Sequence, residues 1–168
     1  TVVLNGTVQV SAVDIPASNG LIHVVDGVIL PQTVDFPGTV VDALLAYPRF
    51  SSLVDAVVAG ELVGTLSATG PFTVFAPTNN AFAALGVDAT TLPLADLQDI
   101  LTYHVVAGDV RAADVVLLTE ATMVNGDTIT IDASSGVVLN DTVNVTFTDI
   151  VTSNGVIHVI DAVLVPAP

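Results

Sequence analysis

The order of apolar and polar residues divides the chain into strand-like and helical regions. Between 143 and 148 apolar and polar residues alternate, which is the two-residue period of a half-buried strand. Residues 156–165 form an almost continuous apolar run, broken by His158 and Asp161, and predict a central strand or two short strands meeting at the aspartate. Asn125-Gly126 separates two short strand-like segments and predicts a hairpin turn.

The middle of the chain has helical spacing instead. Thr39 is placed to cap a first helix that Pro48 ends, and Gly60 stops a second that begins near Phe50. Further helices are expected at 62–66, at 79–85 and after Pro93, with a strand at 72–75. In the helix after Pro93, one face is expected to carry Leu94, Leu97, Leu101 and His104, and a neighbouring face Asp96, Asp99 and Tyr103. Helices followed by antiparallel strands predict an α+β fold.

The chain contains an internal repeat. Residues 2–31 and 137–166 align without a gap at an offset of 135, with 18 identities in 30 positions. One repeat unit is therefore about 135 residues long. This predicts that the chain holds the end of one unit and then a complete second unit, and that its parent is a tandem array.

The charge is strongly one-sided. The 168 residues include 17 acids and 2 bases, giving a formal net charge of −15. Nucleic-acid binding and docking on anionic lipid are disfavoured, because both require clustered Lys and Arg side chains. No apolar run approaches the ~20 residues of a membrane helix, so no membrane insertion is expected, and there are no cysteines. The acidic surface fits either simple solubility or a salt-rich habitat.

The candidate catalytic and metal-binding residues have no supporting pattern. His104 and His158 stand in apolar runs, which favours hydrogen-bonded core histidines over ligands or bases. HExxH and G-x-S-x-G motifs are not present. Asp161 is expected to accept a backbone N–H at a strand kink. The residues Asp127, Asp132 and Asp141 are expected in solvated turns and not in a calcium site.

Three segments resemble the fasciclin domain. Residues 73–82 (TVFAPTNNAF) are similar to its first signature, 153–166 (SNGVIHVIDAVLVP) to its second, and 100–105 (ILTYHV) to its central Tyr-His element. The resemblance covers 33–166, and 1–32 resembles the tail of a preceding domain. It implies a β-wedge or sandwich of about seven strands with a helical layer, in a complete domain over 33–168.

Most motif residues have a structural explanation. Pro77 suits the exit of a strand, Thr78 can cap the next helix, and Asn79 can bond backbone groups in that turn. The ring of Phe82 is expected to fill the core beside Phe75. The motif residues interpreted as mainly structural are Thr73, Phe75, Pro77, Thr78, Asn79, Phe82, Asn154, Gly155, His158 and Asp161.

The resemblance implies a non-enzymatic adhesion module, extracellular or on the cell surface, that binds an unknown protein or cell-surface partner without a cofactor. In animal relatives an Asp-Ile pair and the Tyr-His region are implicated in integrin binding, and Asp99-Ile100 and Tyr103-His104 match these elements. The acidic, Lys-poor composition favours a microbial source, where integrins do not occur. Asp99 is otherwise an exposed acid beside an inward-facing Ile100.

The alternative function is binding of an apolar small molecule such as a carotenoid or lipid. Some fasciclin-family proteins bind such ligands, and a groove between helices and sheet lined by Leu62, Leu66 and Met123 is a candidate site.

Residues 1–32 pose a separate problem, because strands without their domain would expose apolar side chains. The residues concerned are Val8, Val10, Leu21, Ile22, Val24, Val28 and Ile29. The segment could pack on its own domain, pair with a second chain, or exchange with the similar 137–166 strands of a neighbour. We expect an intermolecular arrangement, with Gln32–Gly38 as the hinge, since a complete domain has no vacant position for a second copy.

Overall fold

The computed structural model describes residues 3–4, 8–25, 34–134 and 136–166. The chain divides into two compact units, Thr1–Gln32 and Thr33–Pro168. Of the expected apolar face of 1–32, Val28 and Ile29 lie outside the described residues, as does the side chain of Val8.

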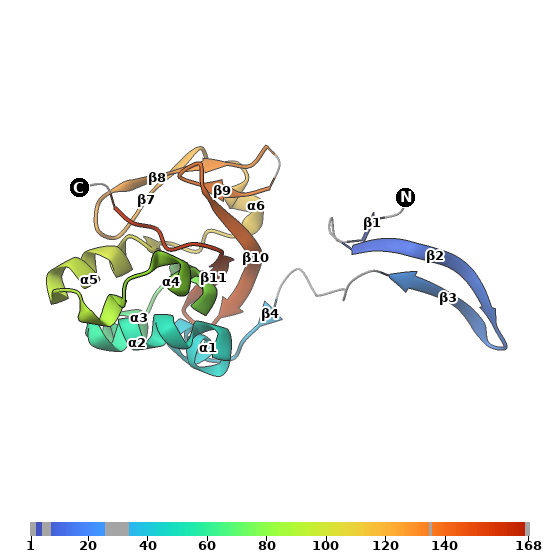
Figure 1. Ribbon diagram of the computed structural model, residues 1–168, viewed down its shortest axis with the longest axis horizontal. Coiled ribbons are helices and arrows are strands. Elements are labelled where there is room, and N and C mark those ends of the chain that lie inside the picture. Colours follow the sequence, from blue (N-terminus) through green and yellow to red (C-terminus); the bar gives the residue numbers. More distant parts are fainter. Residues whose placement is uncertain (1–2, 5–7, 26–33, 135, 167–168) are drawn as a thin grey trace. The chain divides into compact units, whose positions relative to one another are not determined.

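The first unit is a small antiparallel sheet with the strand order β1-β2-β3. Its strands are β1 (Val3–Leu4), β2 (Val8–Ala17) and β3 (Gly20–Val25). β2 and β3 form a long curved hairpin (Figure 1).

The second unit combines helices with a mixed sheet, which confirms the predicted α+β class. Its helices are α1 (Val40–Ala46), η1 (Pro48–Phe50), α2 (Ser51–Ala59), α3 (Val63–Leu66), α4 (Asn79–Leu85), η2 (Ala89–Thr91), α5 (Leu94–Thr102) and α6 (Ala112–Val115). Its strands are β4 (Val34–Asp35), β5 (Phe72–Pro77), β6 (Val105–Ala107), β7 (Glu120–Thr122), β8 (Thr128–Asp132), β9 (Val138–Leu139), β10 (Val143–Thr152) and β11 (Gly155–Ile160).

The eight strands of this sheet follow the order β6-β5-β11-β10-β9-β8-β7, with β4 paired to β10. The strands of the second half, β7 to β11, pair antiparallel as expected. The two strands of the helical first half add parallel pairings, β5 with β11 and β4 with β10. Parallel strands need a long crossover, and here the chain from α4 to β10 supplies the one between β5 and β11. Figure 1 shows α1 to α5 gathered at one end of the unit and β7, β8 and β9 at the other.

Local signals explain the helix ends. Thr39 caps α1 in a capping box with Asp42: each side chain accepts the other residue's backbone N–H, at 3.3 and 2.8 Å. Thr78 caps α4 by accepting the Ala81 N–H, as expected. The Asn125-Gly126 turn joins β7 to β8, with Gly126 at φ +100°.

Two hydrophobic clusters form the core. The first lies between the helices and the sheet and includes Phe50, Leu97, Ile150 and Ile157. The second is built on the β7–β10 end of the sheet, from Phe75, Tyr103, Ile129 and Leu139 among others. β11 contributes to both, since its residues alternate between the two faces of the sheet.

The segment 32–38 is not the free hinge that the sequence predicts. Val34 and Asp35 form β4, and the Phe36 N–H donates to the Val151 carbonyl at 2.7 Å. The part of the expected hinge from Val34 onward is therefore fixed to the sheet, and Gln32 lies outside the described residues.

Candidate functional site

The turn between β10 and β11 (residues 153–155, the Asn154 turn) connects three parts of the second unit. The Asn154 side-chain oxygen accepts the Val40 N–H at the start of α1, at 2.8 Å. Its amide donates to the Leu66 and Ala68 carbonyls at the end of α3, both at 2.9 Å. Asn154 thus satisfies one orphan donor at a helix start and a carbonyl at a helix end.

Gly155 allows the start of β5 to approach this turn closely. A Cβ atom added at Gly155 would lie 2.0 Å from the Phe72 carbonyl oxygen, and one added at Gly70 would lie 2.0 Å from the backbone carbonyl oxygen of Asn154. No side chain fits at these distances, so the Asn-Gly pair of the second signature has a structural role at this corner.

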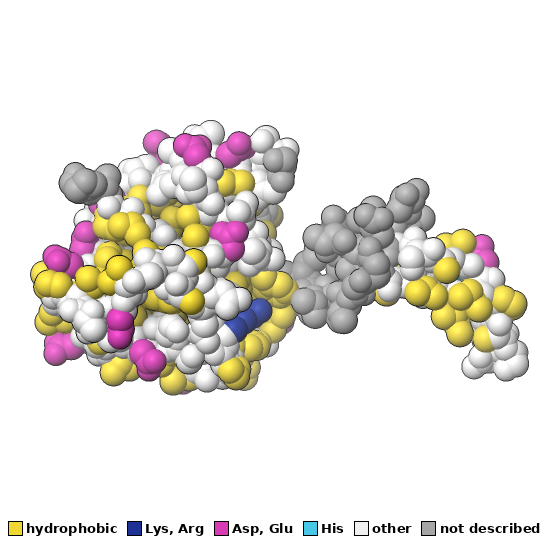
Figure 2. Space-filling model, in the orientation of Figure 1, with side chains coloured by type: hydrophobic (Ala, Val, Ile, Leu, Met, Phe, Trp, Pro, Cys, Tyr) yellow, Lys and Arg dark blue, Asp and Glu magenta, His cyan; other side chains and the backbone are white. Residues whose placement is uncertain are grey.

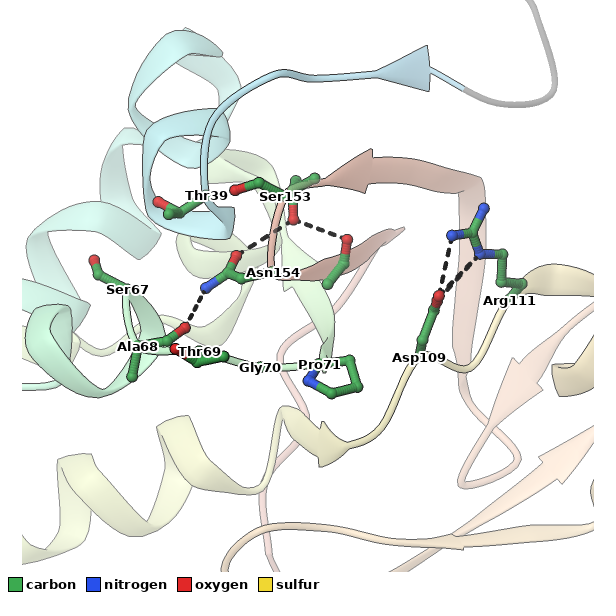
Figure 3. A pocket seen from close by; sticks show the side chains of 12 residues that line it. Thr39, Ser67, Ala68, Thr69, Gly70, Pro71, Asp109, Arg111, Ser153 and Asn154 are labelled. Atoms are coloured by element: carbon green, nitrogen blue, oxygen red, sulfur yellow. Dashed lines mark hydrogen bonds and ion pairs between the residues drawn. The ribbon is translucent and has the colours of Figure 1, made fainter.

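A shallow polar pocket of about 480 Å³ lies beside the Asn154 turn (Figure 3). Its wall combines the α1 cap at Thr39, the loop 67–71, the turn itself, and the pair Asp109 and Arg111. Arg111 and Asp109 form an exposed ion pair at 3.0 Å, which raises the pKa of Arg111 chiefly through hydrogen bonding. The cation is already paired, so the pocket offers polar hydrogen-bonding groups but little net positive charge.

His158 is a core histidine, as predicted. Its Nδ1 accepts the Asp149 N–H at 3.3 Å, and its Nε2 lies 2.8 Å from the Val110 carbonyl. A ring that accepts at one nitrogen and donates at the other is neutral, and burial lowers the pKa of His158. The 3.9 Å approach to the Asp149 carboxylate is therefore not an ion pair, and that carboxylate instead accepts the Ala112 N–H of α6 at 2.9 Å.

His104 is also buried and neutral. Its Nε2 accepts the Leu164 N–H at 2.9 Å, so Nδ1 carries the hydrogen and donates to the Ile100 carbonyl at 2.7 Å. Burial lowers the pKa of His104 to about 4, although the bond to Ile100 opposes that shift. The ring ties the segment after β11 to the end of α5.

Tyr103 is buried as well. Its hydroxyl accepts from the Asn140 side chain at 3.0 Å and lies 3.4 Å from the Thr128 carbonyl. Tyr103 still has helical dihedral angles, and its backbone N–H donates to the Asp99 carbonyl at 2.9 Å, so helical spacing holds there. Its ring is buried because it packs into the second hydrophobic cluster. Tyr103 and His104 are thus 4% and 2% exposed, and their place among the adhesion contacts stays a prediction.

Asp99 and Ile100 remain accessible. Asp99 is exposed on α5, and its carboxylate accepts the Asn125 side-chain amide at 3.0 Å. The same amide donates to Asp127 at 2.9 Å. Ile100 is half-buried. We call Asp99, Ile100, Asn125 and Asp127 the Asp99 surface. It joins α5 to the β7–β8 turn.

The first-signature residues build the fold. Thr73 is fully buried and connects β5 to the segment after β6: its hydroxyl donates to the Gly108 carbonyl at 2.7 Å and accepts the Val110 N–H at 2.8 Å. Phe75 and Pro77 are buried in β5. The expectation that Phe82 packs beside Phe75 is wrong, because Phe82 packs on the helical cluster and Phe75 belongs to the other.

Asn79 differs in detail from its expected role. It bonds not to its own turn but across to the preceding helices: its side chain accepts the Ser52 N–H at 3.0 Å and donates to the Pro48 carbonyl at 3.0 Å. It thereby fixes the start of α4 against α2.

Asp161 caps the end of β11 and accepts a backbone N–H, as predicted. Its two carboxylate oxygens accept the backbone and side-chain N–H groups of Asn144, both at 2.8 Å. The apolar run therefore holds one strand, which ends before the aspartate.

The residues of the expected apolar groove do not come together. Leu62 and Leu66 belong to the helical cluster and Met123 to the other. An apolar cavity of about 90 Å³ lies among Val41, Leu44, Val57 and neighbouring side chains of α1 to α3. Pockets for drug-sized ligands usually measure about 300–1,000 Å³.

The described part of the chain contains no cluster of metal-binding side chains and no unpaired buried polar side-chain atom. Among these residues, no three His, Asp or Glu side chains could together hold a metal ion, and every buried side-chain nitrogen or oxygen has a hydrogen-bond partner. No described helix is long and apolar enough to cross a bilayer.

Sequence reasoning missed Asp149 and the Asp109–Arg111 pair. Asp149 has a counterpart in the repeat, Asp14, and both are followed nine residues later by a histidine. That shared spacing was the available signal, whereas nothing in the sequence indicates that Arg111 faces the Asn154 turn.

Comparison with known proteins identifies the family. The fasciclin domain matches residues 48–166. The Synechocystis protein sll1483 is 44% identical over 144 residues, covering 83% of this chain and 79% of that protein. Pig transforming growth factor-beta-induced protein ig-h3 is 34% identical over 150 residues, covering 88% of this chain but 21% of that protein.

The fold has a solved counterpart. The FAS1 domain pair of the insect cell adhesion molecule fasciclin I superposes with a TM-score of 0.67 and 22% sequence identity, over 95% of this chain and 60% of that structure. The mixed sheet, the helical layer and both signatures agree with the family match. This chain therefore belongs to the fasciclin domain family.

Proposed function

We propose that the chain is a non-enzymatic interaction module of an extracellular, microbial, tandem-repeat protein, and that it adheres to a protein or cell-surface partner. The observation that carries this proposal is the Asp99 surface. It presents an exposed carboxylate held in place by Asn125 on a frame formed by α5 and the β7–β8 turn. The comparisons support the setting, since one solved counterpart is a cell adhesion molecule and one relative comes from the microbe Synechocystis.

The proposed contact is small and open to solvent. Exposed polar contacts each contribute little free energy, so a single module is expected to bind weakly. Linking modules raises the effective concentration of the second contact and makes weak adhesion useful. A tandem array is therefore the form in which this surface would act.

The test is retention of cells on coated surfaces. Intact bacterial cells, with fibroblasts as a second arm, are washed over surfaces coated with the chain or with two chains joined in tandem. We expect the joined form to retain at least about tenfold more cells at equal molar coating. Absence of retention by both forms on both cell types would refute the adhesive function.

The site itself is tested by a matched pair of substitutions. Asp99→Asn removes the charge while keeping an oxygen that can accept the Asn125 amide, and Asp96→Asn removes a charge from an exposed position on the same helix. Asp99→Asn is expected to reduce retention at least about threefold and Asp96→Asn to leave it unchanged. Equal effects would show that retention reflects general charge and not this surface.

A further inference from the structure

The β2–β3 hairpin reproduces the β10–β11 hairpin in detail. Its paired residues, from Val10↔Val25 to Ala17↔Gly20, are the β10–β11 pairs shifted by the repeat offset, with register shifts at the same two places. Asp14 and Asp149 both have positive φ, 57° and 58°. Each donates its backbone N–H to the Nδ1 of a histidine nine residues on, at 3.2 and 3.3 Å.

The two hairpins differ in what covers them. Ile157 is 0% exposed and Val156 is 0% exposed, whereas their counterparts Ile22 and Leu21 are 54% and 61% exposed. Figure 2 shows hydrophobic side chains gathered along the β2–β3 hairpin. Because neighbouring residues of a strand point to opposite faces, both faces of the hairpin that are covered in the second unit carry exposed apolar side chains in the first.

The edge of the hairpin is open in the same way. β11 pairs on one side with β10 and on the other with β5, in parallel, from Gly155↔Phe72 to Ile160↔Pro77. Among the described residues, β3 pairs with β2 and with no other strand. The missing cover therefore has a defined form, namely a parallel strand equivalent to β5 together with helices equivalent to α1 and α2.

A second copy of this chain does not fit that description. In the second unit the β5 edge is already occupied by β11. The two hairpins also differ at positions where β10 and β11 are buried in the second unit. Phe147 packs on the helical cluster with the Arg49 guanidinium 5.8 Å above its ring, and its counterpart is Ala12. The fully buried Val156 corresponds to the larger Leu21.

We propose that residues 8–25 are the docking surface for the body of a different fasciclin unit, which precedes them in the parent polypeptide. That body is the equivalent of residues 34–136. It carries more bulk where this unit accommodates Phe147, and more space where this unit holds Val156. The proposal rests on the tandem arrangement proposed above and is independent of the adhesive role.

The experiment adds a body in front of the full chain. Because the repeat offset is 135, residues 34–136 placed directly before residue 2 continue into 2–31 as they continue into 137–166. Amide hydrogen exchange in β3 is compared between this extended chain and the original chain, with β11 as the internal standard. We expect slow exchange in β11 of both chains, and at least about 100-fold slower exchange of β3 in the extended chain.

A substituted form tests the predicted mismatch. In the extended chain, Ala12→Phe combined with Leu21→Val adapts the hairpin to the added body, and should slow β3 exchange further. The same two substitutions in the original chain should leave β3 exchange unchanged. If neither extended form slows β3 exchange, the proposal is wrong. It is equally wrong if β3 of the original chain is protected in a concentration-dependent dimer, since a second copy would then be the occupant.

Discussion

Replacing Asn154 with alanine removes the connection between the Asn154 turn and two helix ends. Three side-chain hydrogen bonds are lost, those to Val40, Leu66 and Ala68. At about 1 kcal/mol net for each bond, the free energy of unfolding should fall by about 3 kcal/mol. Val40 is fully buried, so its unpaired N–H adds to that loss. A shift of about 10 °C in Tm is expected for a unit of this size.

The internal repeat supplies the control. Asn19 occupies the equivalent turn of the first unit and is exposed, so Asn19→Ala should change the free energy of unfolding by less than about 0.5 kcal/mol. Asn154→Asp keeps the acceptor for Val40 and loses both donors, and should fall between alanine and wild type. Urea denaturation followed by circular dichroism measures all three. Equal effects of the substitutions at Asn154 and Asn19 would refute the assigned role of this turn.

Three further predictions follow from burial and charge. Ile157→Ala should lower the free energy of unfolding by about 2–5 kcal/mol and the exposed Ile22→Ala by much less, as judged by urea denaturation; an unchanged Tm for Ile157→Ala would contradict the buried position of β11. Burial holds the pKa of His104 at about 4, below its usual 6.5, so the folded chain binds fewer protons than the unfolded chain between these pH values. The free energy of unfolding should therefore fall by about 3 kcal/mol as the pH falls from about 6.5 to 4. His104→Gln should reduce this dependence of stability on pH, and an NMR titration of His104 near pH 6.5 would disprove the prediction. Tm should rise between low ionic strength and about 1 M NaCl, since salt screens the repulsion within a net charge of −15, and a flat or falling curve would count against a salt-adapted surface.

Local signals predicted the elements well because their physics is local. The Thr39 and Thr78 caps depend on hydrogen bonds within one helical turn, and the Asn125-Gly126 hairpin depends on a positive φ that glycine adopts readily. The family signatures lie in such elements and in β11, so the α+β class could be read from the sequence.

Contacts between residues far apart in the sequence were harder to predict. The parallel pairing of β5 with β11 joins residues more than 80 positions apart, and no local pattern specifies its direction. Helical spacing places Tyr103 on the same side of the helix as Asp99, but it does not show that β8 and β9, far along the chain, bury the Tyr103 ring. The partners of Asn154 lie 86 to 114 positions away, so the sequence could mark the turn but not its contacts.

The shared geometry of the two hairpins has a consequence for folding in a repeat protein. Each unit ends in a hairpin whose bulges, Asp–His bond and register recur even where its apolar face is exposed, so this shape is encoded within about 20 residues. In the proposed tandem protein, the hairpin of each unit would emerge last during synthesis and would dock onto the body of that unit, which precedes it in the chain. In such an array the same similarity would allow a neighbour's hairpin to dock on the wrong body, which is a characteristic misassembly of repeat proteins. Differences in side-chain size, such as Phe147 in one hairpin and Ala12 at the equivalent position of the other, would then favour docking of each hairpin on the body of its own unit.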